Sequence, residues 1–400
     1  MEGSAHLVEV GHIFFILVVI LVSAKLAGEL FERIGQPAVL GELAAGIVLG
    51  ASMLGLVPVD TADPYGSIVH VMAEIGVAVL LFEIGLETDL RAMFRVGSAA
   101  LTVALVGVVL PFAFGYLFWH LYEGGASLVA IFVGATLTAT SVGITARVLE
   151  DIGKLHTVEA RIIIGAAVID DILGLLILAV VEGLASTGQV SLFGIAKLFA
   201  LALGFLTIAM IVGLATARWL FELVNRMGVR GILVSAAFAF ALLMAFLADR
   251  VGLAPIVGSF AAGLILSRTN QFDTIVDRIK PVADIFTPIF FVSIGAAVDI
   301  TILDPRIPSN HEILVIGGVL FVIAVLGKVV AGYGAFWREF NRLAVGVGMV
   351  PRGEVGLIFA QIGLVSGILT QDVFSAILIM VMGTTLMTPP LLKPLFKRSV

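Results

Sequence analysis

Long apolar stretches separated by short polar ones run along almost the whole chain. A helix of about 20 apolar residues spans the hydrocarbon core of a bilayer, so each long stretch predicts a membrane-spanning helix. Several stretches are short or are interrupted by glycine and proline. The pattern predicts an all-α, polytopic membrane protein with thirteen transmembrane helices, at residues 11–32, 37–56, 67–87, 97–121, 128–149, 160–184, 192–217, 231–249, 254–268, 281–298, 312–337, 342–365 and 370–396.

Composition and charge agree with a membrane protein. Apolar residues make up 60% of the chain and charged residues only 13%, whereas soluble proteins carry about 25% charged residues. The first apolar stretch follows an acidic segment and lacks a cleavage site, so we expect it to be retained rather than removed as a signal peptide. Lysine and arginine fall almost entirely in loops on one side of this arrangement, and the other side carries only Arg250 and Arg306. This bias predicts an N-terminus outside and a C-terminus inside the cell.

An internal repeat is visible at an offset of about 210–217 residues. QPAVLGELAAGIVLG at 36–50 resembles LAPIVGSFAAGLILS at 253–267, and LLFEIGLETDL at 80–90 resembles FFVSIGAAVDI at 290–300. The second copy begins seven helices after the first, and because seven is odd the two copies have opposite orientations in the membrane. Two inverted-topology six-helix repeats are the architecture of secondary transporters, whose binding site lies between the repeats near the bilayer midplane.

Two corresponding helices are interrupted by polar residues, glycine or proline. Residues 138–143 read TATSVG inside one apolar stretch, and residues 349–356 read MVPRGEVG inside its repeat partner. Proline lacks a backbone donor, and glycine with serine or threonine permits local unwinding. Paired interruptions of this kind are the best pointer to the binding site of a transporter. We expect the hydroxyls of Thr138, Thr140 and Ser141, with carbonyls freed around Pro351, to contribute oxygen ligands for a cation.

Three charged residues lie in the middle of apolar stretches. Asp170 and Asp171 are adjacent in IIIGAAVIDDILGLLILAVV, and Lys328 lies in VLGKVVAGY. Ionised groups at this depth need a counter-charge, a cation or water, so they indicate an ion or proton pathway; a structural salt bridge is the alternative. Adjacent helical residues point about 100° apart, so one aspartate should face the lysine and the other should be free for an ion. The residue pattern leaves open which aspartate does which.

Several other charges lie near the ends or interruptions of the predicted helices. Arg352 and Glu354 are interpreted as structural, each neutralised by the other or by Glu74 or Glu83, and a role in the ion path is the alternative. Most acids near the ends of the second and third helices, Glu42 among them, are expected at the membrane interface or facing the cytoplasm. Glu74 and Glu83 are the two that we expect could line an entry funnel.

The residue types favour small monovalent ions. A carboxylate in a low-dielectric site binds a proton or an alkali cation, and two ligands that compete for one site give exchange. The chain has no cysteine and no Cys/His ligand set, which argues against zinc or copper. A cation channel would need a filter along a continuous pore, and an intramembrane aspartyl protease would take its two acids from separate helices. The sequence predicts a carrier rather than an enzyme, with no cofactor and no nucleic-acid partner.

These motifs together resemble the bacterial monovalent cation:proton antiporter-2 family, and within it the Nap-type sodium/proton antiporters. The resemblance rests on GAAVIDDILGL, TATSVGITARVLE, LGKVVAGY and GMVPRGEVGL, and it covers essentially the whole chain. It implies a homodimer with an elevator-like mechanism. Residues 1–95 and 231–300 would form a scaffold (helices 1–3 and 8–10), residues 96–190 and 301–400 a moving core (helices 4–6 and 11–13), and residues 191–230 the linker helix 7.

The resemblance also implies roles for individual residues. Asp171 would be the main sodium and proton ligand, Asp170 would pair with Lys328, and Thr140 and Ser141 would lie near the ion. Because family members with two acids are generally electrogenic, we expect sodium, and lithium as well, to be exchanged for more than one proton per cation. Potassium/proton exchange by the same machinery is the alternative. The expected location is the cytoplasmic (inner) membrane of a bacterium or archaeon.

Overall fold

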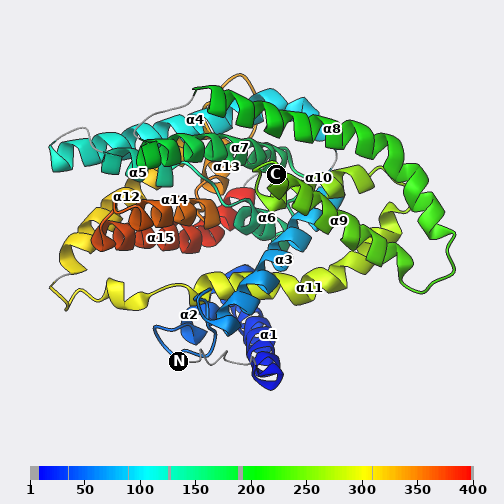
Figure 1. Cartoon of the computed structure of the whole chain (residues 1–400), viewed down its shortest axis with the longest axis horizontal. Helices are drawn as coiled ribbons and strands as arrows, with labels where there is room; N and C mark the ends of the chain where they lie inside the picture. Colours follow the sequence, from blue (N-terminus) through cyan, green and yellow to red (C-terminus); the bar gives the residue numbers. More distant parts are fainter. Residues whose placement is uncertain are drawn as a thin grey trace.

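The computed structural model describes residues 9–34, 36–88, 90–124, 128–187, 192–308 and 310–397, and within these ranges the chain forms helices and no strands. Figure 1 shows their arrangement. In chain order the elements are α1 (Val10–Arg33), α2 (Ala38–Leu49), α3 (Pro64–Glu87), α4 (Leu90–Glu123), α5 (Leu128–Thr136), α6 (Val142–Asp151), α7 (Val158–Thr187), α8 (Leu192–Asn225), α9 (Ile232–Arg250), α10 (Pro255–Leu266), α11 (Phe272–Ala296), the short 3₁₀ helix η1 (Ile300–Leu303), α12 (Asn310–Ala331), α13 (Arg342–Gly348), α14 (Glu354–Val365) and α15 (Gln371–Lys397).

Every predicted apolar stretch coincides with one helix or with a pair of half-helices. Among the described residues, eight helices are long and apolar enough to cross a membrane, and α2 and α10 are shorter apolar helices. The predicted start of the tenth span at residue 281 is wrong, because α11 begins at Phe272. Its first turns carry charged residues that hydropathy excludes but helical hydrogen bonding does not. The all-α membrane architecture is confirmed, and the number of thirteen crossings stays a prediction.

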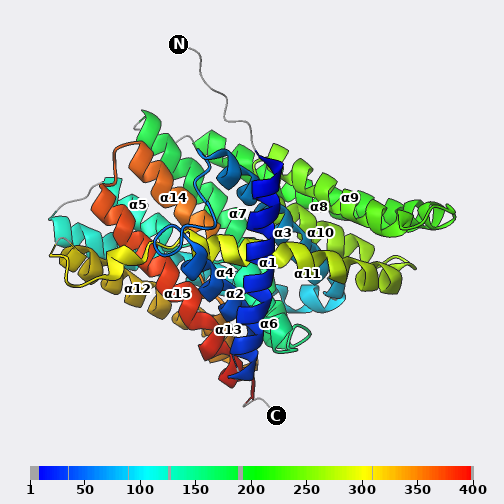
Figure 2. The same ribbon diagram turned by 90° about the horizontal axis from the view of Figure 1, so that it is seen from below.

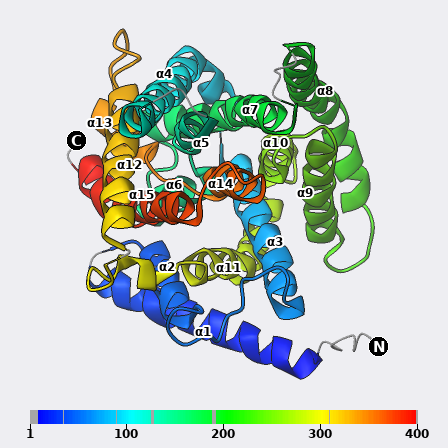
Figure 3. The ribbon, with the colours of Figure 1, turned by 60° about the vertical axis from the view of Figure 1, so that its left-hand side comes forward.

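The helices pack in two groups (Figures 1 and 3). In the first group α3 packs against α10 and α11, α2 packs against α1 and α11, and α9 packs against α10. Figure 2 shows α1 on the outside of this group. In the second group α4 packs against α5, α7 and α12, while α15 packs against α12, α13 and α14. The half-helix α6 belongs to the second group by chain connection, and it is also in contact with α2 and α3 of the first.

Glycines bring the backbones of the first group into direct contact. A Cβ atom added at Gly46 of α2 would lie 2.2 Å from the carbonyl oxygen of Val292 of α11, and one added at Gly295 of α11 would lie 2.2 Å from the carbonyl oxygen of Leu43 of α2. Real Cβ atoms do not approach this closely, so no larger residue fits without moving a backbone. Small residues allow such close approach of membrane helices, where dispersion contacts replace the hydrophobic effect as the source of association.

The same contact recurs between α3 and α10. A Cβ added at Gly263 would lie 2.3 Å from the carbonyl oxygen of Phe82, and one added at Gly85 would lie 2.3 Å from that of Phe260. In the repeat read from the sequence, residues 43 and 46 align with 260 and 263, and residues 82 and 85 align with 292 and 295. The α2–α11 and α3–α10 contacts are therefore repeat-related copies of each other, in agreement with the predicted internal repeat.

The junction between the two groups is looser at α6. A Cβ at Gly143 would lie 3.4 Å from the nearest side-chain atom of Val77 and 3.5 Å from that of Phe290, which is ordinary van der Waals contact. The neighbours are side chains rather than backbone. At Gly143, α6 therefore meets the first group through side chains in ordinary contact, unlike the closely packed backbones at Gly46 and Gly295 inside the first group.

Candidate functional site: a crossing of two broken helices

Two broken helices meet in the second group. The helix of the fifth predicted span breaks between Thr136, where α5 ends, and Val142, where α6 begins. The helix of the twelfth breaks between Gly348, where α13 ends, and Glu354, where α14 begins. Both predicted interruptions are confirmed. We call residues 137–141 and 349–353 together the crossing.

Backbone and hydroxyl groups join the two breaks. The Ser141 N–H donates to the Pro351 carbonyl oxygen at 2.8 Å, and the Thr140 hydroxyl donates to the Met349 carbonyl oxygen at 3.1 Å. Polar backbone groups in a membrane interior need partners, and in this structure each break provides them for the other. A Cβ added at Gly353 would lie 2.8 Å from the Ser141 Oγ, so glycine at position 353 allows the two broken segments to approach each other.

The predicted hydroxyl ligands differ in their bonding. The Thr138 hydroxyl donates to the Ala135 carbonyl oxygen at 2.7 Å and so completes the last turn of α5. The Thr140 hydroxyl uses its proton on the opposite break but keeps its lone pairs. The Ser141 Oγ is buried and has no hydrogen-bond partner within the described chain. A buried hydroxyl without a hydrogen-bond partner destabilises the folded protein, so Ser141 is suited to bind a ligand that supplies the missing interaction.

The charged residues of α7 and α12 lie together. The Lys328 Nζ donates to the Asp170 Oδ2 at 3.1 Å, and both side chains have no exposed area. The other oxygen of this carboxylate, Oδ1, has no hydrogen-bond partner among the described residues. Asp171 is 3% exposed and follows Asp170 on the same helix. Gly107 of α4 makes room for the lysine, because a Cβ there would lie 3.3 Å from Nζ.

Arg352 lies in the second break and is completely buried. Its Nη1 donates to the Ala139 carbonyl oxygen at 2.8 Å, so the guanidinium ties the two breaks together. Its Nε and Nη2 have no hydrogen-bond partner within the described chain. Asp170 is the acid that interacts electrostatically with it. The Arg352 carbonyl oxygen accepts a hydrogen bond from the Thr385 hydroxyl at 2.6 Å.

The glutamates expected to neutralise Arg352 lie in three different places. Glu83 is 3% exposed and interacts electrostatically with other residues, Arg147 among them, so its proposed pairing with Arg352 is wrong. Glu74 lines the same cavity as Arg352, and no ion pair of the described residues joins the two. The side chain of Glu354 lies outside the described part of the structure. Glu42 is 2% exposed, so its side chain is buried among the helices, and its expected position at the membrane interface stays a prediction.

A cavity of about 180 Å³ reaches the crossing from the first helix group. Its lining includes His70 and Glu74 of α3, Ser293 of α11, and Arg352 and Gly353 of the second break. This volume holds several water molecules, because one water occupies about 30 Å³ in the liquid. The cavity therefore extends from polar side chains of the first helix group to residues 352 and 353 of the crossing. Ser141 lies in the other broken segment of the crossing.

Sequence reasoning missed two hydroxyl groups that support the crossing. The Thr145 hydroxyl of α6 donates to the Gly348 carbonyl oxygen at the end of α13, at 2.7 Å. Thr385 of α15 donates to the Arg352 carbonyl oxygen. Thr145 belongs to the same TATSVGIT segment as the predicted ligands, and Thr385 is half of a threonine pair in an apolar stretch. Both threonines stand out in the sequence, but the sequence does not indicate their partners, which lie about 200 residues from Thr145 and about 30 residues from Thr385.

The arrangement provides the elements of a monovalent-cation site. Carboxylate, hydroxyl and carbonyl oxygens are hard ligands. Asp170 interacts electrostatically with Arg352 of the second break, which relates the buried acids to the crossing. The carboxyl ends of α5 and α13 bring partial negative charge to the crossing, and the amino ends of α6 and α14 bring partial positive charge. Lys328 forms an ion pair with Asp170, and Arg352 also interacts electrostatically with that carboxylate, so Asp171 is the second carboxylate at which a cation or a proton can bind.

Comparison with known proteins agrees with this geometry. Residues 16–398 match the family described as sodium/hydrogen exchanger, transmembrane. The high-affinity Na⁺/H⁺ antiporter NhaS3 of Synechocystis sp. is 43% identical, over 95% of this chain and 89% of that protein. The Na⁺/H⁺-K⁺ antiporter GerN of Bacillus cereus is 39% identical, over 96% of each.

A solved structure shares the fold. The structure of the sodium proton antiporter MjNhaP1 from Methanocaldococcus jannaschii superposes with a TM-score of 0.76 at 17% identity, over 98% of this chain and 99% of that one. At this identity the likeness concerns the fold alone. With a family match over nearly the whole length and relatives covered almost end to end, the chain belongs to the sodium/hydrogen exchanger family, a family of multi-pass membrane transporters.

Proposed function

We propose that this protein is a secondary antiporter that exchanges sodium, and also lithium, for protons across the cytoplasmic (inner) membrane of a bacterium or archaeon. The observation that carries the proposal is the buried ion pair between Asp170 and Lys328, adjacent to Asp171. A structural salt bridge would need one acid and one base. Asp171 adds a second buried carboxylate at the same depth, and a bound cation or proton can balance its charge.

The residues divide the chemistry between them. In the proton-loaded state Asp171 is protonated and Lys328 is an ammonium ion paired with Asp170. In the sodium-loaded state Na⁺ is held by the Asp171 carboxylate with oxygens of Thr140 and Ser141, the pair with Asp170 is broken, and Lys328 has released its proton. Each cycle then moves two protons against one sodium ion, and one net charge crosses the membrane. This bookkeeping makes the exchange electrogenic.

The two helix groups are proposed to move as separate units. The first group would be the scaffold (residues 1–95 and 231–300), the second the moving core (96–190 and 301–400), and α8 the linker (191–230). The backbone contacts at Gly46 and Gly295 support a rigid scaffold, and the ordinary side-chain contact at Gly143 supports a junction along which the core can slide. A homodimer, an outside N-terminus and an inside C-terminus complete the proposal, the orientation being supported by the distribution of lysine and arginine.

Potassium/proton exchange is the second candidate. It is favoured by the likeness to GerN, a Na⁺/H⁺-K⁺ antiporter with 39% identity. The oxygen ligands of the crossing suit either alkali cation, since both ions are hard and monovalent.

Proteoliposomes with an imposed proton gradient test the proposal. A pH-sensitive dye is quenched inside, and sodium, lithium or potassium chloride is added outside in turn. We expect dequenching with sodium and lithium, and no dequenching when Asp171→Asn replaces the wild type. Dequenching only with potassium would establish the second candidate, and no response to any of the three ions would refute antiport. Asp284→Asn is the matched control, because this exposed carboxylate on α11 lies outside the crossing and its loss should leave the response unchanged.

A further inference from the structure

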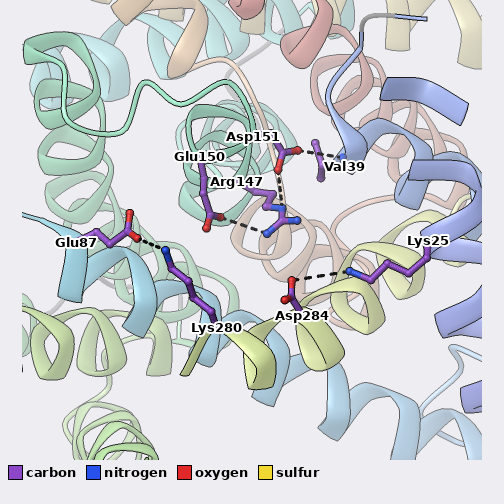
Figure 4. Close-up of polar contacts among 8 residues, drawn as sticks. All are labelled: Lys25, Val39, Glu87, Arg147, Glu150, Asp151, Lys280 and Asp284. Atoms are coloured by element: carbon purple, nitrogen blue, oxygen red, sulfur yellow. Dashed lines mark hydrogen bonds and ion pairs between the residues drawn. The ribbon is translucent and has the colours of Figure 1, made fainter. Parts of the chain in front are cut away.

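Helix α2 begins without a cap of its own. Its N-cap residue is Pro37, which has no side-chain acceptor, and no side-chain hydrogen bond caps the helix from within the segment. The first backbone N–H groups of a helix have no partner inside the helix, so they need one from elsewhere. The Val39 N–H finds it in Asp151, whose Oδ2 accepts at 3.3 Å from the end of α6 (Figure 4). A carboxylate at this position also interacts favourably with the helix dipole.

Arg147 holds Asp151 in this position. Its Nε lies 3.1 Å from the Asp151 Oδ1, and its Nη1 lies 3.3 Å from the Glu150 Oε2. All three side chains belong to α6 and are at most 23% exposed. The guanidinium therefore fixes the rotamer of the capping carboxylate and neutralises part of the charge that it brings into the junction.

Glu42 adds a second contact from α2. It lies three residues after Val39, is 2% exposed, and its Oε2 has no hydrogen-bond partner within the described chain. Arg147 is the charged residue with which it interacts most strongly, and the interaction is attractive. The amino-terminal turn of α2 and the carboxyl-terminal turn of α6 thus hold each other through one hydrogen bond and through the charge of Arg147.

The neighbouring ion pairs do not cross this junction. Glu87 of α3 and Lys280 of α11 are 3.1 Å apart, and Lys25 of α1 and Asp284 of α11 are 3.9 Å apart (Figure 4). Both pairs join helices of the first group. The Asp151 hydrogen bond and the attraction between Glu42 and Arg147 are the contacts of this cluster that join that group to α6 in the described part of the chain.

We propose that Asp151, oriented by Arg147, is a lock that caps α2 from the other side of the core–scaffold junction and keeps the cytoplasmic end of the transporter closed, so that each transport cycle must break it. The proposal rests on the two-unit mechanism given above. The lock lies at the end of α3 that carries Glu87, whereas the cavity that reaches Arg352 is lined by Glu74, more than three helical turns away. The cavity thus lies at the end of the junction near Glu74, and the lock lies at the opposite end, near Glu87.

A single introduced cysteine measures the opening of the junction. The chain has no native cysteine, so Ala146→Cys gives one reactive thiol. Ala146 is fully buried and precedes Arg147 on α6, three residues after Gly143, which faces Val77 and Phe290. In inside-out membrane vesicles, the rate at which a membrane-impermeant maleimide labels this thiol reports how often the cytoplasmic end opens.

Removing the cap should accelerate labelling. On the Ala146→Cys background we expect Asp151→Ala to raise the labelling rate about fivefold, the population change that loss of one helix cap produces. Asp151→Asn should raise it less but still above the control, because asparagine can keep the hydrogen bond to the Val39 N–H but loses the negative charge and the ion pair with Arg147. Asp284→Asn, which breaks an ion pair inside the scaffold, should leave the rate unchanged.

The outcomes are distinguishable from a failure of the antiport proposal. Labelling requires no transport, and exchange by the wild type is measured separately in proteoliposomes. Unchanged labelling in Asp151→Ala would overturn the lock, as would an equal increase in Asp284→Asn. If Asp151→Ala does not reach the membrane, Asp151→Asn decides alone: a rate above that of the Asp284→Asn control supports the lock, and a rate equal to that of the control overturns it.

Discussion

Replacement of Asp170 by asparagine tests the coupling between the buried ion pair and the charge moved in each cycle. The substitution keeps the volume of the side chain and removes its negative charge. Lys328 lies 3.1 Å from this carboxylate and has no exposed area, so it would lose its counter-charge in a desolvated site. A buried lysine without a counter-charge favours its neutral form. We expect Lys328 to stop carrying a proton, and exchange to become electroneutral with one proton per sodium ion.

The magnitude follows from the charge bookkeeping. One elementary charge moved through 100 mV corresponds to about 2.3 kcal/mol. Because each 1.4 kcal/mol is a factor of about ten, a 100 mV potential should shift the sodium concentration ratio at which wild-type flux stops by about fiftyfold. For Asp170→Asn the same potential should shift that ratio by less than about twofold, since no net charge crosses.

Proteoliposomes with equal pH on both sides provide the assay. A diffusion potential of a permeant anion sets the voltage without adding potassium, and sodium flux is followed at several concentration ratios until its direction reverses. Asp284→Asn is the control and should keep the full wild-type shift. A shift of about fiftyfold in Asp170→Asn would refute the assignment of a transported proton to Lys328, and complete loss of exchange would show that Asp170 is itself an essential ligand.

Three further predictions concern stability and affinity. Lys328→Met leaves the Asp170 carboxylate buried without its lysine partner and should destabilise the protein by about 3–5 kcal/mol, whereas adding Asp170→Asn should recover most of this loss. Thermal unfolding of the detergent-solubilised protein measures both effects. An unchanged unfolding midpoint in Lys328→Met would contradict the argument that the buried carboxylate needs its partner. Gly46→Ala should destabilise the protein by about 1–3 kcal/mol or abolish expression, because the added Cβ would overlap the Val292 carbonyl oxygen. Gly143→Ala should be tolerated, because its Cβ would make ordinary contacts. Similar unfolding midpoints for the two variants would show that the glycine contacts do not stiffen the scaffold. Ser141→Ala should leave stability unchanged or raised, because the hydroxyl has no hydrogen-bond partner among the described residues, and it should weaken apparent sodium affinity about tenfold. An unchanged KM for sodium would remove Ser141 from the ligand set.

Sequence reasoning predicted the parts of the site that depend on local pattern. Hydropathy located the helices, and the TATSVG and MVPRGEVG segments located both breaks, because proline, glycine and short polar side chains act on the backbone where they occur. The repeat placed these breaks in corresponding helices. The charges of Asp170, Asp171 and Lys328 stood out because an ionisable residue in an apolar stretch requires an explanation wherever it is found.

Partner choice was less accessible to the sequence. Arg352 was expected to meet a glutamate. Within the described part of the chain it donates a hydrogen bond to the Ala139 carbonyl oxygen, a backbone group that every residue possesses. Glu83 was expected to pair with the arginine of the break, and it interacts electrostatically with Glu150, Glu87 and Arg147 instead. A charged side chain can reach several helices, so composition alone does not determine which neighbour it meets.

By itself the sequence determined the all-α membrane architecture, the inverted repeat and the two breaks, since each follows from periodicity, length or a backbone-specific residue type. The tertiary structure decided that Asp170 rather than Asp171 contacts Lys328, because adjacent helical residues point about 100° apart and only the placement of α12 selects one of them. It also decided that Asp151 caps α2, because a helix lacking its own cap can accept a carboxylate from any segment that packing brings to its end.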